Sequence, residues 1–113
     1  VQTCALPIWA YPWGDEFGFD KANVAEKLGE GMGTTSVCTY PQGVSPEDGW
    51  DMSGNIWEWT GSLYGKGSVS YVLRGGSWRR DRRYARCACR GRGIPADFDT
   101  HYGFRVVVSL GRF

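Results

Sequence analysis

The sequence has one histidine and only four cysteines, and it contains no long uninterrupted hydrophobic run. Because His101 is the only imidazole, the chain cannot build a metal centre from several histidines by itself. No stretch approaches the roughly 18 apolar residues of a membrane-spanning helix. Residues 1–8 also lack the basic start and the apolar length of a signal peptide. These absences predict a soluble chain with no membrane partner, and they leave its compartment open.

The few cysteines are placed unfavourably for disulfides or zinc. Cys87 and Cys89 are too close in the chain to join each other comfortably, and a zinc site would need Cys38 and His101 at unhelpful spacings. We therefore expect reduced cysteines that act as small buried hydrophobic residues.

Large aromatic residues and glycine are abundant. The 113 residues include six Trp, six Tyr, five Phe and 17 Gly, which favours short strands and many loops over long helices. The net charge is only +1, but residues 79–113 carry nine arginines against three aspartates. Such a basic run can bind nucleic acid. The alternative is that these arginines pair with acids inside the fold, to which arginine is suited, and we favour it over a nucleic-acid partner.

Two segments have the composition of β-strands. They are Tyr71 to Leu73 and the apolar run from Phe104 to Val108, and the chain between them is irregular and rich in arginine. Upstream, Trp57 and Trp59 alternate around Glu58. In a strand the two indoles would share one face, and the carboxylate on the other face would pair with an arginine or a metal.

Several motifs occur in a fixed order: YPWGDEF, DMSGNIWEWT, VLRGGSW and GFRVV. Together they resemble the formylglycine-generating enzyme (sulfatase-modifying factor) family, over residues 11–109. The resemblance implies an α+β, C-type-lectin-like fold, loop-rich with short antiparallel strands. It corresponds to the C-terminal part of the family domain, so we expect residues 9–113 to be an incomplete domain. Residues 1–8 fit nothing that follows, and we interpret them as a non-native leader.

The resemblance does not extend to the copper site of the family's oxidases. The two positions that carry the copper-binding cysteines correspond to Arg80 and Ala85, and neither side chain can bind copper(I). We therefore expect no copper and a ligand-binding role. The alternative is an oxidoreductase of the same family, using copper or non-haem iron on a cysteine or thiol, whose remaining site lies in an N-terminal part. Whether the protein is an enzyme stays open.

Calcium ligands carry over from the family more directly. The resemblance implies a site at Asn55, the Ile56 carbonyl and Glu58, and a second, partial one at Asn23 and the Val24 carbonyl. The alternative for Glu58 is an ion pair with Arg74 or Arg105.

The segment between the two expected strands is the candidate ligand-binding surface. Loops held at both ends by strands can display varied side chains to a protein or a small-molecule ligand. The oligomeric state is not predicted. The candidate contact residues are Arg79, Arg80, Asp81, Arg83, Tyr84, Ile94, Asp97, Asp99, Thr100, His101 and Tyr102.

A second pattern lies in the same segment. Residues 79–105 contain no Lys, Glu, Gln, Met or Trp, which are the residues that adenine changes in an AAC codon cannot produce. The variable proteins of diversity-generating retroelements, which share this fold, are rewritten in that way between their GGSW and GFR motifs. The alternative is an ordinary loop rich in arginine and glycine, and we favour that alternative.

Overall fold

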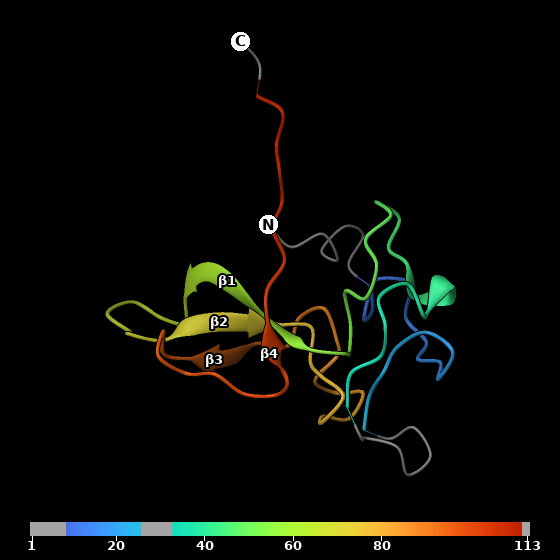
Figure 1. The fold of residues 1–113 in the computed structure, drawn as a ribbon, viewed down its shortest axis with the longest axis horizontal. Coiled ribbons are helices and arrows are strands. Elements are labelled where there is room, and N and C mark those ends of the chain that lie inside the picture. The colour runs from blue at the N-terminus through green and yellow to red at the C-terminus, as the bar shows by residue number, and fades with distance from the viewer. Residues whose placement is uncertain (1–8, 26–32, 112–113) are drawn as a thin grey trace.

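The computed structural model describes residues 9–25 and 33–111, so the expected leader at residues 1–8 lies outside the described part. The elements in chain order are the 3-10 helix η2 (Pro41–Gly43) and the strands β1 (Trp57–Leu63), β2 (Tyr71–Arg74), β3 (Gly91–Gly93) and β4 (Tyr102–Gly103). The strands form one small sheet, and loops make up most of the remainder (Figure 1). Within the described ranges, no helix has the length and apolar character needed to cross a membrane.

The sheet has the strand order β3-β2-β1-β4. β1 and β2 form an antiparallel hairpin in which Glu58 lies opposite Arg74 and Trp59 lies opposite Leu73. β3 adds to β2 antiparallel, whereas β4 runs parallel to β1. The strand expected at Tyr71–Leu73 is therefore confirmed, and the expectation of antiparallel pairing holds for all the strands except β4.

The two tryptophans of β1 lie over the glycines of β3. A Cβ atom on Gly91 would lie 3.2 Å from Cη2 of Trp57, and one on Gly93 would lie 2.7 Å from Cη2 of Trp59. Both indoles therefore project from the same face of the sheet, as the alternation predicted. Only glycine leaves room for this close approach, because any side chain at Gly93 would overlap the ring.

A second packed cluster joins the N-terminal loops to the arginine-rich segment. It is formed by Tyr11, Ala22, Val24 and Ala85, all at most 5 % exposed. Backbone bonds tie the same parts together: the Cys87 N–H donates to the Ala10 carbonyl at 2.8 Å. The arginine-rich segment is thus anchored to a core at Ala85 and is not a free excursion.

The glycine pair after β2 sets the path of the arginine-rich segment. Gly75 and Gly76 have φ values of +97° and +72°, in the left-handed region that favours glycine. A Cβ atom on Gly76 would lie 2.8 Å from the carbonyl oxygen of Tyr84. The turn therefore lets the backbone at Tyr84 pack directly onto it.

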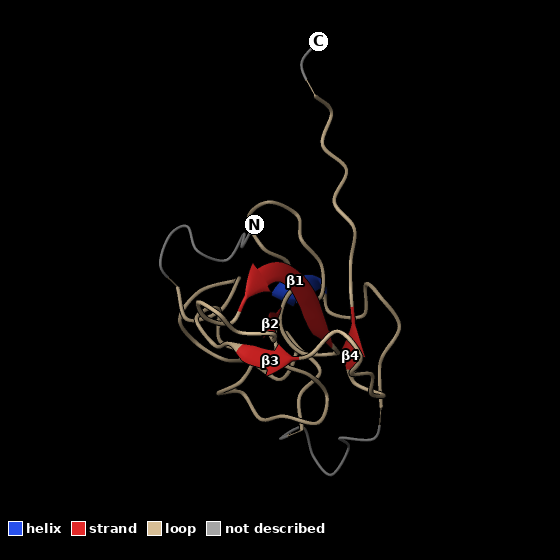
Figure 2. Ribbon diagram, turned by 90° about the vertical axis from the view of Figure 1, so that its left-hand side faces the viewer, coloured by secondary structure: helices blue, strands red, loops and turns tan. Residues whose placement is uncertain are grey.

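The strand expected at Phe104–Val108 is wrong. Pairing stops at Gly103, and the chain runs on in extended form away from the body (Figures 1 and 2). Phe104 and Val107 are 71 % and 86 % exposed. Strand propensity needs a neighbouring strand, and among the described residues none pairs with this segment beyond Gly103.

Among Cys38, Cys87 and Cys89, the cysteines that the structure describes, no two form a disulfide with each other. Their expected burial is wrong for Cys38, which is exposed, while Cys87 and Cys89 are half-buried. Cys4 lies outside the described residues.

Candidate functional site

The tryptophan face of the sheet and the arginine-rich segment enclose a small pocket of about 140 Å³. Tyr84 meets Trp57 edge to face, with ring centroids 6.4 Å apart, and Tyr102 meets Trp59 in the same way at 6.0 Å. Aromatic contacts therefore join β1 to the loop at Tyr84 and to β4 at Tyr102. The residues that line the pocket are Trp57, Leu73, Arg80, Tyr84, Arg90, Gly91, Arg92 and Tyr102.

Arg80 gives this pocket a positive charge. Its guanidinium lies over the ring of Tyr84, 5.2 Å from the centroid, in a cation–π arrangement. Within residues 9–25 and 33–111 it forms no salt bridge with a carboxylate. The site therefore combines aromatic surface with a guanidinium that has donors to spare, and residues of these types dominate the binding energy of many protein interfaces.

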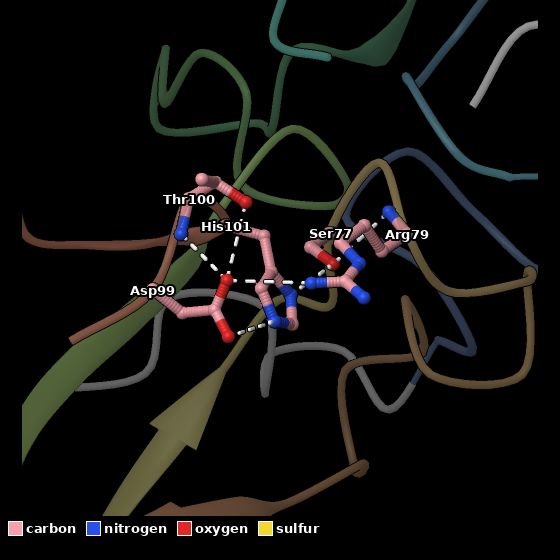
Figure 3. A network of polar contacts seen from close by, with 5 residues as sticks. All are labelled: Ser77, Arg79, Asp99, Thr100 and His101. Atoms are coloured by element: carbon pink, nitrogen blue, oxygen red, sulfur yellow. Dashed lines mark hydrogen bonds and ion pairs between the residues drawn. The ribbon is translucent and has the colours of Figure 1, made fainter. Parts of the chain in front are cut away.

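Beside the pocket, five polar residues form a connected network (Figure 3). The ring of His101 is buried, with Nδ1 2.9 Å from Ser77 Oγ and Nε2 3.6 Å from Asp99 Oδ2. Asp99 also accepts a hydrogen bond from Arg79 Nη1 at 3.3 Å. We place the His101 proton on Nε2, facing the carboxylate, so that Nδ1 accepts from the Ser77 hydroxyl. The network ties the turn after β2 to the start of β4.

The surroundings lower the pKa values of His101 and Asp99, the two titrating groups of this network. Burial is the main cause that lowers the pKa of His101, with Arg79 and Arg80 acting in the same direction and Asp99 opposing them. For Asp99, desolvation opposes the shift, but hydrogen bonds from Thr100 and the charges of His101 and Arg79 lower its pKa. At neutral pH the His101 imidazole is therefore uncharged and lies beside the ionised carboxylate of Asp99. Ser77 is fully buried, so this serine–histidine–aspartate arrangement offers no nucleophile to a substrate.

The eleven candidate contact residues divide into groups that the structure separates. Some line the pocket, some form the network, and two pairs make local turns of their own. Asp81 forms an ion pair with Arg83 at 2.7 Å, which lowers the pKa of Asp81, and the Ile94 N–H donates to Asp97. The pocket residues are Arg80, Tyr84 and Tyr102, and the network residues are Arg79, Asp99, Thr100 and His101.

Sequence reasoning missed five of the eight residues that line the pocket. Trp57 and Leu73 were expected only as strand residues, and Arg92 was not singled out. The available signal was the period-two alternation of the strands, which puts Trp57 and Trp59 on one face. The pairing of β2 with β3, which brings Gly91 to that face, carries no such local signal.

The candidate calcium residues have other partners. Asn55 Oδ1 accepts hydrogen bonds from the Thr35 N–H at 2.9 Å and from Asn23 Nδ2 at 3.3 Å. Glu58 accepts two hydrogen bonds from the guanidinium of Arg105, which take up both carboxylate oxygens. This arrangement does not fit a calcium ion without a change of partners, although it does bring Asn23 and Asn55 together. Calcium binding through Ile56 or Val24 stays a prediction.

The two positions aligned with copper-binding cysteines lie in unlike surroundings. Arg80 is exposed, whereas Ala85 is 1 % exposed and belongs to the second core. Neither side chain offers sulfur, so the residues present do not fit copper(I). Burial is the main cause that raises the pKa of the Cys89 thiol, which favours its protonated form at neutral pH.

Residues 9–110 match the family model described as a sulfatase-modifying factor enzyme 1-like domain. Among curated proteins, the chain is 32 % identical over 119 residues to the inactive C-alpha-formylglycine-generating enzyme 2 of Mus musculus, covering 90 % of this chain and 37 % of that protein. It is 33 % identical over 117 residues to the serine/threonine-protein kinase pkn1 of Chlamydia pneumoniae, covering 88 % of this chain and 18 % of the kinase. The chain thus spans less than two fifths of these relatives.

Two solved structures share the fold at 21 % identity. PvdO from Pseudomonas aeruginosa superimposes with a TM-score of 0.68 over 91 % of this chain and 46 % of that chain. Treponema denticola variable protein 1 superimposes with a TM-score of 0.63 over 75 % of this chain and 34 % of that chain. The expected loop-rich, C-type-lectin-like fold is confirmed, and the chain covers part of the domain.

Proposed function

Because the chain belongs to the sulfatase-modifying factor enzyme family, we propose that it is a ligand-binding member that presents residues 79–102 as its contact surface. The observation that carries the proposal is the aromatic pocket under that segment, with Arg80 over Tyr84. The positions that would need thiolates for copper oxidation hold Arg80 and Ala85. The similar mouse protein, which is named an inactive enzyme, agrees with a family member that does not oxidise.

A protein is the ligand that this pocket suits best. Its volume of about 140 Å³ is well below the roughly 300–1,000 Å³ of small-molecule sites, so it has room for one side chain of a partner. Tyr84 and the exposed arginines around it supply aromatic area and hydrogen-bond donors, the usual anchors of protein interfaces. A nucleic-acid partner would need a continuous basic groove with stacking rings, and two of the arginines are paired with Asp81 and Asp99.

The direct test begins with a peptide library displayed on phage and selected against the full chain. The affinity of a selected peptide is then measured for Tyr84→Ala and Tyr102→Ala, with Val69→Ala as the control. Val69 is exposed in the loop between β1 and β2, away from the pocket. We expect each tyrosine variant to bind about tenfold to a hundredfold more weakly, the loss typical of an interface anchor, and the control to bind normally. Equal affinity for all three variants and the wild type would refute the proposal.

The second candidate is an oxidoreductase of the same family. It is favoured by a match of 36 % identity over 89 residues to the hercynine oxygenase of Mycolicibacterium thermoresistibile, covering 60 % of this chain and 20 % of that protein. Copper or iron uptake, or conversion of a cysteine peptide by the longer protein, would support this candidate. Substituting Cys87 and Cys89 without loss of that conversion would show that these thiols take no part.

Diversification of the contact surface is a further proposal about its origin. The fold shared with the Treponema variable protein supports it only at the level of fold. The structure restricts where variation could occur, because Gly91 and Gly93 pack against the indoles of β1 and accept no larger residue without rearrangement. A template repeat and a reverse transcriptase beside the coding sequence would support diversification.

A further inference from the structure

A second, larger cavity lies on the other side of the sheet. It has a volume of about 450 Å³, within the usual range of small-molecule sites. Val72 and Arg74 alternate with the tryptophan-side Leu73 along β2, so their side chains point to the opposite face from the pocket described above. None of the lining residues is acidic. They are Thr60, Gly61, Ser62, Leu63, Val72, Arg74 and Arg90.

Arg90, which lines this cavity, and Arg92 of β3, which lines the first pocket, lie on the same aromatic ring. The guanidiniums of Arg90 and Arg92 are 4.4 Å and 5.4 Å from the centroid of Tyr64, and Arg90 also donates to the Tyr64 carbonyl. Two like charges on one ring repel each other unless an anion lies between or beside them. Across the described ranges, neither arginine forms a salt bridge with a carboxylate.

A third arginine approaches from β2. Arg74 Nη1 donates to the carbonyls of Cys87 and Cys89, both at 3.1 Å, which fixes its guanidinium without neutralising its charge. Its cross-strand neighbour, Glu58, is the nearest acid in the strand register, but Arg105 takes up both of its carboxylate oxygens. Arg74 and Arg90 therefore line the cavity without forming a salt bridge to any carboxylate of the described residues, and Arg92 shares the ring of Tyr64 with Arg90.

We propose that this cavity binds a small molecule through a tetrahedral dianion, a phosphate or a sulfate group. Guanidinium groups match the oxygens of such anions with paired hydrogen bonds, and a double negative charge compensates more of the local charge than a single carboxylate does. The hydroxyls of Thr60 and Ser62 lie along the same wall. The site shares Arg90 with the first pocket, but its ligand is an anion held beside β1 and β2, so it goes beyond the proposed function.

Isothermal titration calorimetry of the full chain tests the proposal, with sodium phosphate and sodium sulfate titrated separately at an ionic strength held constant with sodium chloride. We expect saturable binding of one anion or both, and weaker binding of acetate. Arg90→Gln and Arg92→Gln each remove one charge and should weaken binding about tenfold, as expected for a lost hydrogen bond to a charged group. Arg92 is the safer variant, because its guanidinium makes no side-chain hydrogen bond among the described residues and contacts only the ring of Tyr64 there.

Arg83→Gln is the matched control, since it removes the same charge from an exposed side chain that pairs with Asp81 on the arginine-rich segment. It should bind the anion as the wild type does, and so should Tyr84→Ala, whose ring lines the other pocket. Binding of phosphate alone or of sulfate alone supports the proposal and identifies the anion. No saturable binding, or equal affinity in the wild type, Arg92→Gln and Arg83→Gln, overturns it and leaves the peptide-binding test untouched.

Discussion

His101 shows how a residue that looked like a binding side chain serves the fold instead. It was expected at the ligand surface, but its ring is 5 % exposed and bonds to Ser77 from within. The imidazole joins the turn after β2 to the residue before β4, so it supports the pocket residue Tyr102, with which it also makes a ring contact at 4.8 Å. Nothing in the local sequence separates this role from an exposed one, because the burial arises from packing of distant segments.

The lowered pKa of His101 gives a prediction for stability against pH. In the unfolded chain His101 takes up a proton near pH 6.5, whereas the pKa of the folded, buried imidazole is lower. The folded state therefore keeps its full stability above pH 6.5. As the pH falls below that value, the unfolded state binds the proton more readily and the free energy of unfolding decreases. We expect the melting temperature to fall by about 4 °C between neutral pH and pH 5.5, the change that roughly 1 kcal/mol causes in a small domain. Differential scanning calorimetry at both pH values measures it.

The control is His101→Gln, which keeps a hydrogen-bonding side chain but does not titrate. Because His101 is the only histidine of the chain, this variant should show a flat melting temperature over the same range. A wild-type melting temperature that does not change between the two pH values would contradict the neutral, buried imidazole.

At the scale of elements, Arg105 connects the segment after β4 to β1 and to the preceding loop. Its guanidinium donates to Glu58 and to the carbonyls of Trp50 and Asp51, at 2.9 Å and 3.1 Å. The hydrogen bond that Arg105 donates to Glu58 is the main cause that raises the pKa of Arg105. A single side chain thus holds in place a segment that has no strand partner beyond Gly103 among the described residues.

Glu58→Gln should lower the free energy of unfolding by about 1–2 kcal/mol, measured by urea denaturation. The loss stays modest because both side chains keep some contact with water, which weakens ion pairs. Asp81→Asn is the control, since it breaks an ion pair on an exposed loop and should cost well under about 1 kcal/mol.

Calcium separates the two roles predicted for Glu58. If Glu58 serves only as the ion-pair partner of Arg105, adding calcium leaves the melting temperature of the wild type unchanged. We expect this outcome because Arg105 occupies both carboxylate oxygens of Glu58. A rise with calcium that is lost in Glu58→Gln would instead show coordination by this carboxylate.

The strands show what sequence can and cannot predict. Tyr71–Leu73 and the shared face of Trp57 and Trp59 were predicted correctly, because alternation and β-branching are local properties. The same reasoning failed for Phe104–Val108, whose composition favours a strand as strongly. The difference lies outside the segment, since a strand forms only where a neighbour supplies hydrogen bonds.

For the whole molecule, the family motifs predicted the fold, whereas the binding surface depended on how the loop returns to the sheet. The residues of GNIWEW and RGGSW meet where the Trp78 N–H donates to the Asn55 carbonyl, which explains why both motifs mark one architecture. The division of the arginine-rich segment into pocket, network and local turns was not predictable, because it follows from the anchoring of Ala85 and the packing of Gly76 against Tyr84.

The exposed segment from Phe104 to Leu110 gives the molecule an unprotected apolar edge. Val106, Val107 and Val108 are 77–86 % exposed in extended backbone, the kind of segment that pairs with another chain. We expect the chain to associate as its concentration rises, and Val107→Lys to suppress this without lowering the melting temperature, since the side chain is in solvent and a lysine disfavours edge pairing. Sedimentation velocity over a concentration series measures the association.

Val69→Lys is the matched control, because Val69 is 74 % exposed in the loop between β1 and β2 and away from the extended segment. Equal suppression by both lysines would show that net charge, and not the extended edge, governs association.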